Sequence, residues 1–334
     1  DMTGWRRDFH RYPELGFNEH RTSARVAELL REFGLEVHTG VGGTGVVGVL
    51  QRGNGEASIA FRADMDALPI TETGNPEWRS AHDGVMHACG HDGHSSMLLG
   101  AAAHLAQNGD FNGRAIFIFQ PNEEHGLGAT AMIDDGLFTR FEADAVFAMH
   151  NIPGMPAGNF ATRAGAMTAS ESLFEITIRA RGSHAAMPHM GVDAIYVGAQ
   201  LVTALQGIVS RTLDPARNGV VSVTEFITDG RRNVLPGTAV LKGDARALGD
   251  DTNTAIEAAM RRICAGIAST HNVEIEVAYD TVFPALANHH EAAGAAVAAA
   301  RAVAGEDRVN PACDPKLFSE DFAHMARVVP ACFM

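Results

Sequence analysis

Short, continuous apolar runs alternate in the first half of the chain with segments whose apolar residues recur every three or four positions. Such runs are typical of strands buried on both faces, and they lie at 46–50, 59–63, 115–119 and 145–149. The recurring apolar positions predict helices, the clearest at 26–33 and 95–107. Strands that alternate with helices in this way indicate a mostly parallel sheet that is covered on both faces.

The pattern changes near residue 170. Apolar and polar residues alternate over 174–180, as in a sheet with one face exposed to water. Further along the chain come a helical stripe, two strands, a second helical stripe and a last alternating strand, at 201–209, 220–227, 238–247, 256–267 and 273–277. Asp251 or Thr252 is the expected cap of the second helix. The order strand, helix, strand, strand, helix, strand predicts a ferredoxin-like unit.

This unit is predicted to be an insertion, because alanine-rich, helix-forming sequence resumes at 291–304. We therefore expect a first domain formed by residues 1–168 and 285–334, and an inserted domain formed by residues 169–284. A length of 334 residues is sufficient for two such domains.

Composition narrows the possible partners. The 26 Lys and Arg residues stand against 40 Asp and Glu residues, for a net charge of −14. Because like charges repel, we expect neither nucleic acid nor a membrane surface as a partner. Polar residues, glycine and proline interrupt the apolar stretches too often for a membrane span. The four cysteines lack the spacing of a disulfide framework, which is typical of the cytoplasm, so we expect a cytoplasmic protein.

Polar residues follow three of the predicted buried strands, at the point where each strand ends. In chain order they are Asp64 and Asp66, Glu123 and Glu124, and His150. A fourth polar cluster at 87–94, with Cys89 and His91, directly precedes the predicted helix at 95–107. Because the carboxyl ends of parallel strands and the following helix N-termini share one edge of a sheet, these segments should meet. Thiolate, imidazole and carboxylate together are the ligand set of a divalent ion such as Zn²⁺.

Each segment taken alone also has a purely structural explanation. A lone thiol beside histidines is often a small buried residue, adjacent glutamates often form a solvated face, and a histidine after a strand is often satisfied at the sheet edge. Four separate segments converging on one edge favour a metal site. Glu123 and Glu124 add a specific feature, because two neighbouring carboxylates cannot point the same way. One can bind metal while the other faces the open coordination position and transfers protons, which a closed structural site does not need.

Seven motifs are spread over nearly the whole chain. They are HRYPELGF at 10–17, RADMDALP at 62–69, MHACGHD at 86–92, QPNEE at 120–124, GSHAAMPH at 182–189, NVLP at 233–236 and SEDF at 319–322. With these motifs the chain resembles the M20 metallopeptidases, in particular the amidohydrolase branch of hippurate hydrolases, N-acyl-amino-acid deacylases and auxin-conjugate hydrolases. The resemblance implies an α/β fold: a phosphorylase/hydrolase-like catalytic domain with the inserted ferredoxin-like (βαββαβ) domain as a lid and dimerisation domain.

The resemblance also implies a homodimer and a centre of one or two divalent ions, which could be Zn, Mn, Co or Ni. The metal ligands that it implies are Cys89, His91, Glu124 and His150. Glu123 matches the general base, and Asp66 matches a residue that orients the ligands.

Three further matches lie in the predicted inserted domain. His184 matches a histidine that reaches the active site of a partner subunit and polarises the substrate carbonyl. Asn233 and Arg246 match positions that hold the substrate carboxylate, for which the guanidinium fork is suited. The alternatives are that Arg246 is a solvated strand residue and His184 a turn histidine.

Two departures from the family pattern concern Asn122 and His125, neither of which replaces a ligand. The family has one more histidine ligand well after the SEDF motif. The sequence ends 12 residues past Phe322 without one, so we expect either an incomplete C-terminal part or an impaired second metal position.

We therefore expect a metal-dependent amidohydrolase that removes an acetyl or benzoyl group from a small N-acyl amino acid. Metal-activated water would attack the amide carbon, with Glu123 as general base. One alternative is a thiol hydrolase with Cys89 as nucleophile, which would resist chelators. The other is a non-catalytic, dimerising binding protein that retains the fold, which measurable hydrolysis would rule out.

Overall fold

The computed structural model describes residues 1–334, and the chain forms two compact units. Unit 1 consists of Asp1–Met167, Ala287–Asp314 and Glu320–Met334, and unit 2 of Thr168–Leu286 and Pro315–Ser319. The segment at 315–319, which we expected in the first domain, packs in unit 2, where the Ala169 N–H donates to the Lys316 carbonyl at 3.1 Å. That unit 2 acts as a lid and dimerisation domain stays a prediction.

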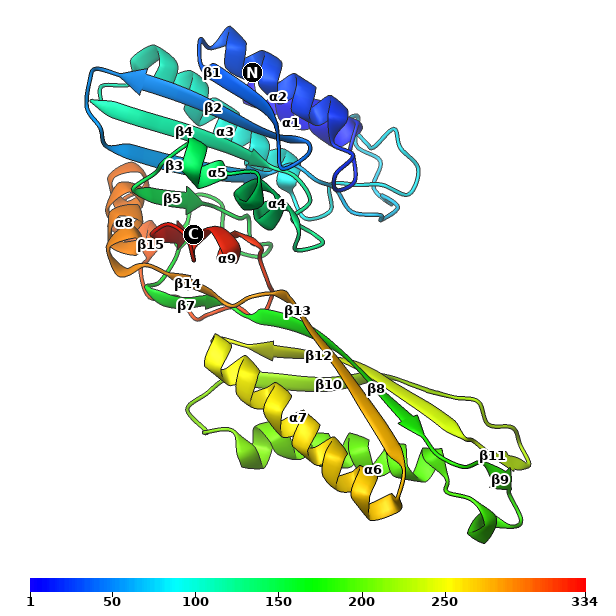
Figure 1. Cartoon of the computed structure of the whole chain (residues 1–334). Coiled ribbons are helices and arrows are strands. Elements are labelled where there is room, and N and C mark those ends of the chain that lie inside the picture. The colour runs from blue at the N-terminus through cyan, green and yellow to red at the C-terminus, as the bar shows by residue number, and fades with distance from the viewer. The chain divides into compact units, whose positions relative to one another are not determined.

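Unit 1 is built on a six-stranded sheet with the strand order β1-β2-β4-β3-β5-β16 (Figure 1). Its strands are β1 (Glu36–Val41), β2 (Gly45–Arg52), β3 (Ser58–Asp64), β4 (Gly113–Gln120), β5 (Ala145–Ala148) and β16 (Ala331–Phe333). The neighbours β4-β3-β5-β16 pair in parallel. Strand β2 pairs antiparallel both with β1 and with β4. The sheet is thus mixed, and β1 escaped prediction because it is an edge strand with mostly accessible side chains.

Helices cover this sheet. They are α1 (Met2–Arg11), α2 (His20–Glu32), α3 (His91–Asn108), α4 (Gly128–Asp134), α5 (Leu137–Arg140), α8 (His290–Ala304) and α9 (Phe322–Met325). Phe9, Leu30 and Leu99, from α1, α2 and α3, share one buried cluster with Phe117 and Phe119 of β4. Short elements complete unit 1: β6 (Phe160–Ala161), β15 (Val309–Asn310) and η3 (Glu306–Arg308); β7 (Gly165–Thr168) and β14 (Leu286–Asn288) include the residues where the chain passes between units.

Helix α3 begins at His91, four residues earlier than the predicted start at 95. Gly90 precedes it with φ of 95°, in the left-handed region that favours glycine, and an added Cβ would lie 2.2 Å from Asn151 Oδ1. The predicted start was wrong because the first turn, with His91 and His94, is polar yet buried and so breaks the apolar periodicity. The turn therefore presents its polar side chains inside unit 1.

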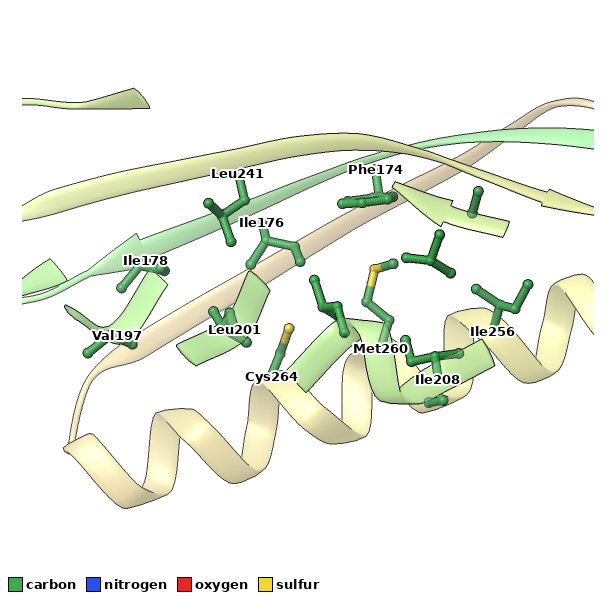
Figure 2. Close-up of a cluster of buried hydrophobic side chains, with 14 of the residues drawn as sticks. Phe174, Ile176, Ile178, Val197, Leu201, Ile208, Leu241, Ile256, Met260 and Cys264 are labelled. Atoms are coloured by element: carbon green, nitrogen blue, oxygen red, sulfur yellow. The ribbon is translucent and has the colours of Figure 1, made fainter. Parts of the chain in front are cut away.

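Unit 2 has a four-stranded antiparallel sheet with the order β10-β12-β8-β13. Its elements are β8 (Ser170–Arg179), β9 (Ser183–His184), η1 (Pro188–Met190), α6 (Ala194–Gly207), η2 (Ile208–Thr212), β10 (Gly219–Thr228), β11 (Val234–Leu235), β12 (Thr238–Ala247), α7 (Asp250–His271) and β13 (Glu274–Phe283). The main elements have the strand–helix–strand–strand–helix–strand order that the sequence indicates. Figure 2 shows Ile176 and Leu241 of the sheet facing Leu201 of α6 and Met260 of α7 in the buried core.

One detail of unit 2 differs from the prediction. The cap of α7 is Gly249, and Asp251 and Thr252 already lie in its first turn. Gly249 is extended, and the Asp251 side chain accepts from the N–H of its own neighbour Thr252 at 2.8 Å. None of the helices in either unit combines the length and the apolar character needed to cross a bilayer.

Candidate metal centre

The sequence-predicted ligands of unit 1 converge on His91. One potential ligand atom from each of Cys89, His91 and His150 lies within 4.8 Å of the others, and the same holds for His91, Glu123 and Glu124. Cys89 Sγ is 3.3 Å from His150 Nε2. His91 belongs to both groups, so the first turn of α3 joins the segment that follows β4 to the residue that follows β5. The structure thus brings all four predicted ligands and Glu123 together.

Two atoms at the centre of this cluster lack hydrogen-bond partners. His91 Nε2 and Glu124 Oε1 are both buried without a hydrogen bond, and they face each other at 3.8 Å. A buried polar atom without a partner costs free energy and calls for an explanation. A divalent cation that accepts a lone pair from each atom would satisfy both, and the thiol and second imidazole beside them are suitable further donors. The donor set therefore fits a divalent metal.

Asp66 holds two of these residues in place. Its Oδ1 lies 3.3 Å from His91 Nδ1, and its Oδ2 accepts the Glu124 N–H at 3.0 Å. This contact places the His91 ring with Nδ1 toward the carboxylate and Nε2 toward Glu124. Burial alone would lower the pKa of His91, but the Asp64 charge and the hydrogen bond with Asp66 raise it well above its usual value. Asp66 has the arrangement of an orienting residue behind metal ligands.

Asp64 and His94 form a second buried pair, and the sequence interpretation placed both at this edge of the sheet without giving either an individual role. His94 Nδ1 lies 2.7 Å from Asp64 Oδ1, and its Nε2 lies 2.6 Å from Asn151 Oδ1. Burial favours the neutral form of Asp64, but His91, His94 and Arg62 hold the pKa of its carboxyl well below the usual value. Placing the start of α3 at His91 would have revealed His94, because residues three apart share one helix face.

The segment after β4 is fixed residue by residue. Asn122 has φ of 48° and donates its N–H to the buried Glu19 at 2.9 Å. The next side chain, Glu123, accepts the Asp321 N–H at 3.3 Å, whereas the Glu124 N–H donates to Asp66. The two neighbouring carboxylates consequently occupy different surroundings, with Glu123 toward Asp321 and Glu124 toward His91.

Glu123 lies in an acidic, buried environment. Burial raises the pKa of Glu123 well above its usual value, and the charges of Glu320 and Asp321 add to that effect. Arg62 sits within this environment and contacts Asp64, Glu320 and Asp321 at 2.8, 2.8 and 2.9 Å. Arg62, Glu320 and Asp321 lie inside the RADMDALP and SEDF motifs, but no local pattern in the sequence connects residues this far apart.

The predicted substrate residues of unit 2 fall into two places. His184 is exposed on β9, where it pairs with Val234 of β11, and the Ala185 N–H donates to the Asn233 carbonyl at 3.0 Å. Arg246 lies at the opposite end of β12 from Thr238, the strand residue closest in sequence to β11.

At that end of β12 each of the three guanidinium nitrogens of Arg246 donates one hydrogen bond. The guanidinium donates to Asp244 at 2.8 Å, to Glu171 at 2.6 Å and to the Ser319 hydroxyl at 2.8 Å. Unit 2 thus brings His184 and Asn233 together but not Arg246. Arg246 is a partly buried, paired strand residue rather than a solvated one.

Comparison with known proteins agrees with this architecture. Residues 60–334 match the profile of the peptidase family M20/M25/M40. The chain is 43% identical to a hippurate hydrolase of Campylobacter jejuni, over 95% of this chain and 82% of that protein. It is 39% identical to an N-acyl-L-amino acid amidohydrolase of Geobacillus stearothermophilus, over 87% and 79% of the two chains. A dinuclear metal-binding M20 peptidase of Bacillus subtilis superposes with a TM-score of 0.87 at 31% identity, covering 99% and 86%.

The fold and the site define a metal-binding hydrolase whose catalytic unit has an α/β architecture. The chain belongs to peptidase family M20, and within that family it is a metal-dependent amidohydrolase. This agrees with the expectation from the sequence and disfavours both the thiol hydrolase and the non-catalytic binding protein.

Proposed function

We propose that this protein hydrolyses the amide bond of N-acyl amino acids that carry an acetyl or benzoyl group. The observation that carries the proposal is the pair of buried, unpartnered atoms, His91 Nε2 and Glu124 Oε1, directly beside the buried carboxyl of Glu123. The substrate class is supported by the names of relatives, a hippurate hydrolase and an N-acyl-L-amino acid amidohydrolase.

Cys89, His91, Glu124 and His150 would hold the metal, with Asp66 orienting His91 and the Glu124 peptide. Their sulfur, nitrogen and oxygen donors suit Zn, Mn, Co or Ni. When bound, such an ion acts as a Lewis acid toward a carbonyl group and makes water more acidic. Glu124 and the two imidazoles serve only as ligands in this proposal, and proton transfer is left to Glu123.

Glu123 is the proposed general base and acid. Its adjacency to Glu124 places it beside the donor cluster, and its hydrogen bond with the Asp321 N–H fixes one carboxyl oxygen. In amide hydrolysis it would take a proton from the attacking water and then deliver it to the nitrogen of the leaving amino acid. A raised pKa suits this two-way role, because the group must both accept and release a proton.

His184, Asn233 and Arg246 would contact the substrate, and their positions in unit 2 support a homodimer. Thr238 and Arg246 are eight residues apart on one strand, which is about 26 Å of extended chain. Thr238 marks the end of β12 that is next to β11 and His184. A single N-acyl amino acid is far shorter than this distance, so His184 and Arg246 would contact one substrate only if they came from two copies of the chain. Strand β10 is an unpaired edge of the same sheet, and its exposed Phe226 and Ile227 are suited to pairing with a second copy.

The test combines metal analysis with a substrate panel. We expect hydrolysis of N-acetyl and N-benzoyl amino acids, loss of that activity after chelation, and recovery when Zn, Mn, Co or Ni is added back. N-acyl diaminopimelate compounds serve as the contrasting substrates. Absence of hydrolysis with every metal and every N-acyl amino acid would contradict the proposed function.

The two glutamates are then separated by substitution. Glu123→Gln should lower kcat about 10²- to 10⁴-fold while bound metal stays at the wild-type level, because it removes only the proton carrier. Glu124→Gln is the matched control and should lose metal. Loss of metal from Glu123→Gln instead would show that the two roles are exchanged.

A further inference from the structure

A buried polar frame lies behind Glu123, and the proposed function gives none of its members a role in metal binding or proton transfer. It consists of Arg62, Gln120 and Asp321, each at most 4% exposed. We infer that Asp321, held by Arg62 and Gln120, is the positioning residue that aims the Glu123 carboxyl at its substrate. This inference rests on the proposed function, because it assigns Glu123 as the group that moves the proton.

The Asp321 carboxylate receives donors from three elements of unit 1. Arg62 of β3 donates to Oδ1 at 2.9 Å, and Gln120 at the end of β4 donates to both oxygens at 2.7 and 2.8 Å. The Ala129 N–H of α4 donates to Oδ2 at 2.9 Å. A side chain held from three directions has little freedom, and it fixes the peptide to which it belongs.

That peptide is the one that contacts Glu123. The Asp321 N–H donates to Glu123 Oε1 at 3.3 Å, and Asp321 is fully buried as the residue that precedes α9. Gln120 is three residues before Glu123 and also accepts the Arg62 Nε–H at 2.8 Å. The frame therefore holds the start of the segment 120–124 and the carboxyl at its catalytic position at the same time.

Charge neutralisation alone does not account for Asp321. The single positive charge of Arg62 already contacts Asp64 and Glu320, both buried, at 2.8 Å each. Arg62 is also the cation that pairs with Asp321, so the burial of a third carboxyl on this one guanidinium adds a desolvation cost. The four hydrogen bonds that Asp321 accepts from three donor groups, and its contact with Glu123, give it a positional role instead.

The test is Asp321→Asn. An amide NH₂ in place of either carboxylate oxygen meets the donors of Arg62, Gln120 or Ala129, so the residue must turn and carry its N–H away from Glu123. We expect kcat to fall about 10- to 100-fold, because a displacement of the Glu123 carboxyl by about 1 Å can lower the rate by up to about 100-fold. We expect KM to change less than about 3-fold and metal content to stay at the wild-type level, since only the proton carrier moves.

Two further measurements keep the inference falsifiable. A crystal structure of Asp321→Asn should show the Glu123 carboxyl displaced from its wild-type position. If Asp321→Asn does not fold, Gln120→Met is the second variant. It keeps the approximate side-chain shape, removes the amide that donates to Asp321, and should give the same split of kcat and KM. Asp144→Asn, which removes one carboxylate oxygen at the other end of β3 where Asp144 accepts the Ser58 N–H, is the matched control and should leave kcat unchanged.

The outcomes separate this inference from the proposed function. Normal kcat in Asp321→Asn, or an unmoved Glu123 in its crystal structure, overturns the positioning role while leaving wild-type hydrolysis intact. A parallel loss of metal and activity also overturns it, because the residue would then act on the metal site. If the wild-type protein hydrolyses no N-acyl amino acid, the proposed function fails, and the crystallographic displacement of Glu123 still decides the structural part.

Discussion

At the scale of single residues, most buried carboxylates and imidazoles of the site have a named partner. Asp66 uses both carboxylate oxygens, Asp64 pairs with His94, and Arg62 has three carboxylates. His91 Nε2 and Glu124 Oε1 differ from this pattern, because they lie 3.8 Å apart without a hydrogen bond, beside further potential ligands that a bound cation would join.

His10 shows how such pairing affects stability. Its Nδ1 lies 2.9 Å from Asp92 and its Nε2 lies 3.3 Å from Glu72. The hydrogen bond with Asp92 raises the pKa of His10, against the opposing effect of burial. A histidine with a raised pKa in the folded state stabilises the fold fully below the unfolded value of about 6.5, and that contribution is lost as pH rises through the folded pKa.

We therefore expect His10→Gln to lower the free energy of unfolding by about 1–3 kcal/mol near pH 6 and by less near pH 9. Denaturant unfolding at both pH values measures the difference. The control is His20→Gln, which removes an exposed histidine on α2. An equal loss of stability at both pH values would argue against a charged His10.

At the scale of elements, the sequence predicted the helices and strands whose apolar residues recur at a regular period. The strands β2, β3, β4 and β12 are continuous or alternating in apolar residues and lie where the patterns indicate. The start of α3 was missed, because its first turn is buried for chemistry rather than for packing. Asp321 and Arg62 were also out of reach, since they lie 259 positions apart and only the folded sheet brings them together.

A substitution at Gly90 tests whether the left-handed turn before α3 controls the site. Alanine there adopts φ of 95° at a cost of about 1–2 kcal/mol and meets Asn151, which follows the proposed ligand His150. We expect Gly90→Ala to lower stability by at least this amount and to weaken metal binding, as measured by thermal unfolding with and without metal.

Gly93→Ala in the same helix is the matched control. No atom lies within 4 Å of an added Cβ at Gly93, so this substitution should be neutral or stabilise α3 by up to about 1 kcal/mol. Equal behaviour of the two variants would show that the left-handed turn does not control the site.

At the scale of the whole molecule, the chain contains two separately cored units, and the proposed site residues are divided between them. The metal cluster belongs to unit 1, and His184, Asn233 and Arg246 belong to unit 2. Arg246 and the His184 region lie at opposite ends of one sheet, so under the proposed function a complete site would require residues from two copies of the chain.

This requirement predicts complementation. Glu123→Gln and His184→Ala should each be inactive alone. Mixed and allowed to exchange subunits, they should regain about a quarter of the wild-type activity, because half of the dimers are mixed and each mixed dimer has one intact site. The mixture is assayed on an N-acyl amino acid, with ultracentrifugation to report the dimer. No recovery despite demonstrated subunit exchange would place His184 in the site of its own chain.

The contacts of Arg62 also have a consequence for the order in which the protein matures during synthesis. Arg62 emerges from the ribosome early, yet two of its three carboxylates, at 320 and 321, are made more than 250 residues later. Until then the buried Nη2 of Arg62 lacks its two acceptors, and a buried donor without an acceptor opposes closure of the sheet. Most of unit 2 is one continuous segment between these partners, so it can assemble while unit 1 still waits for its last residues.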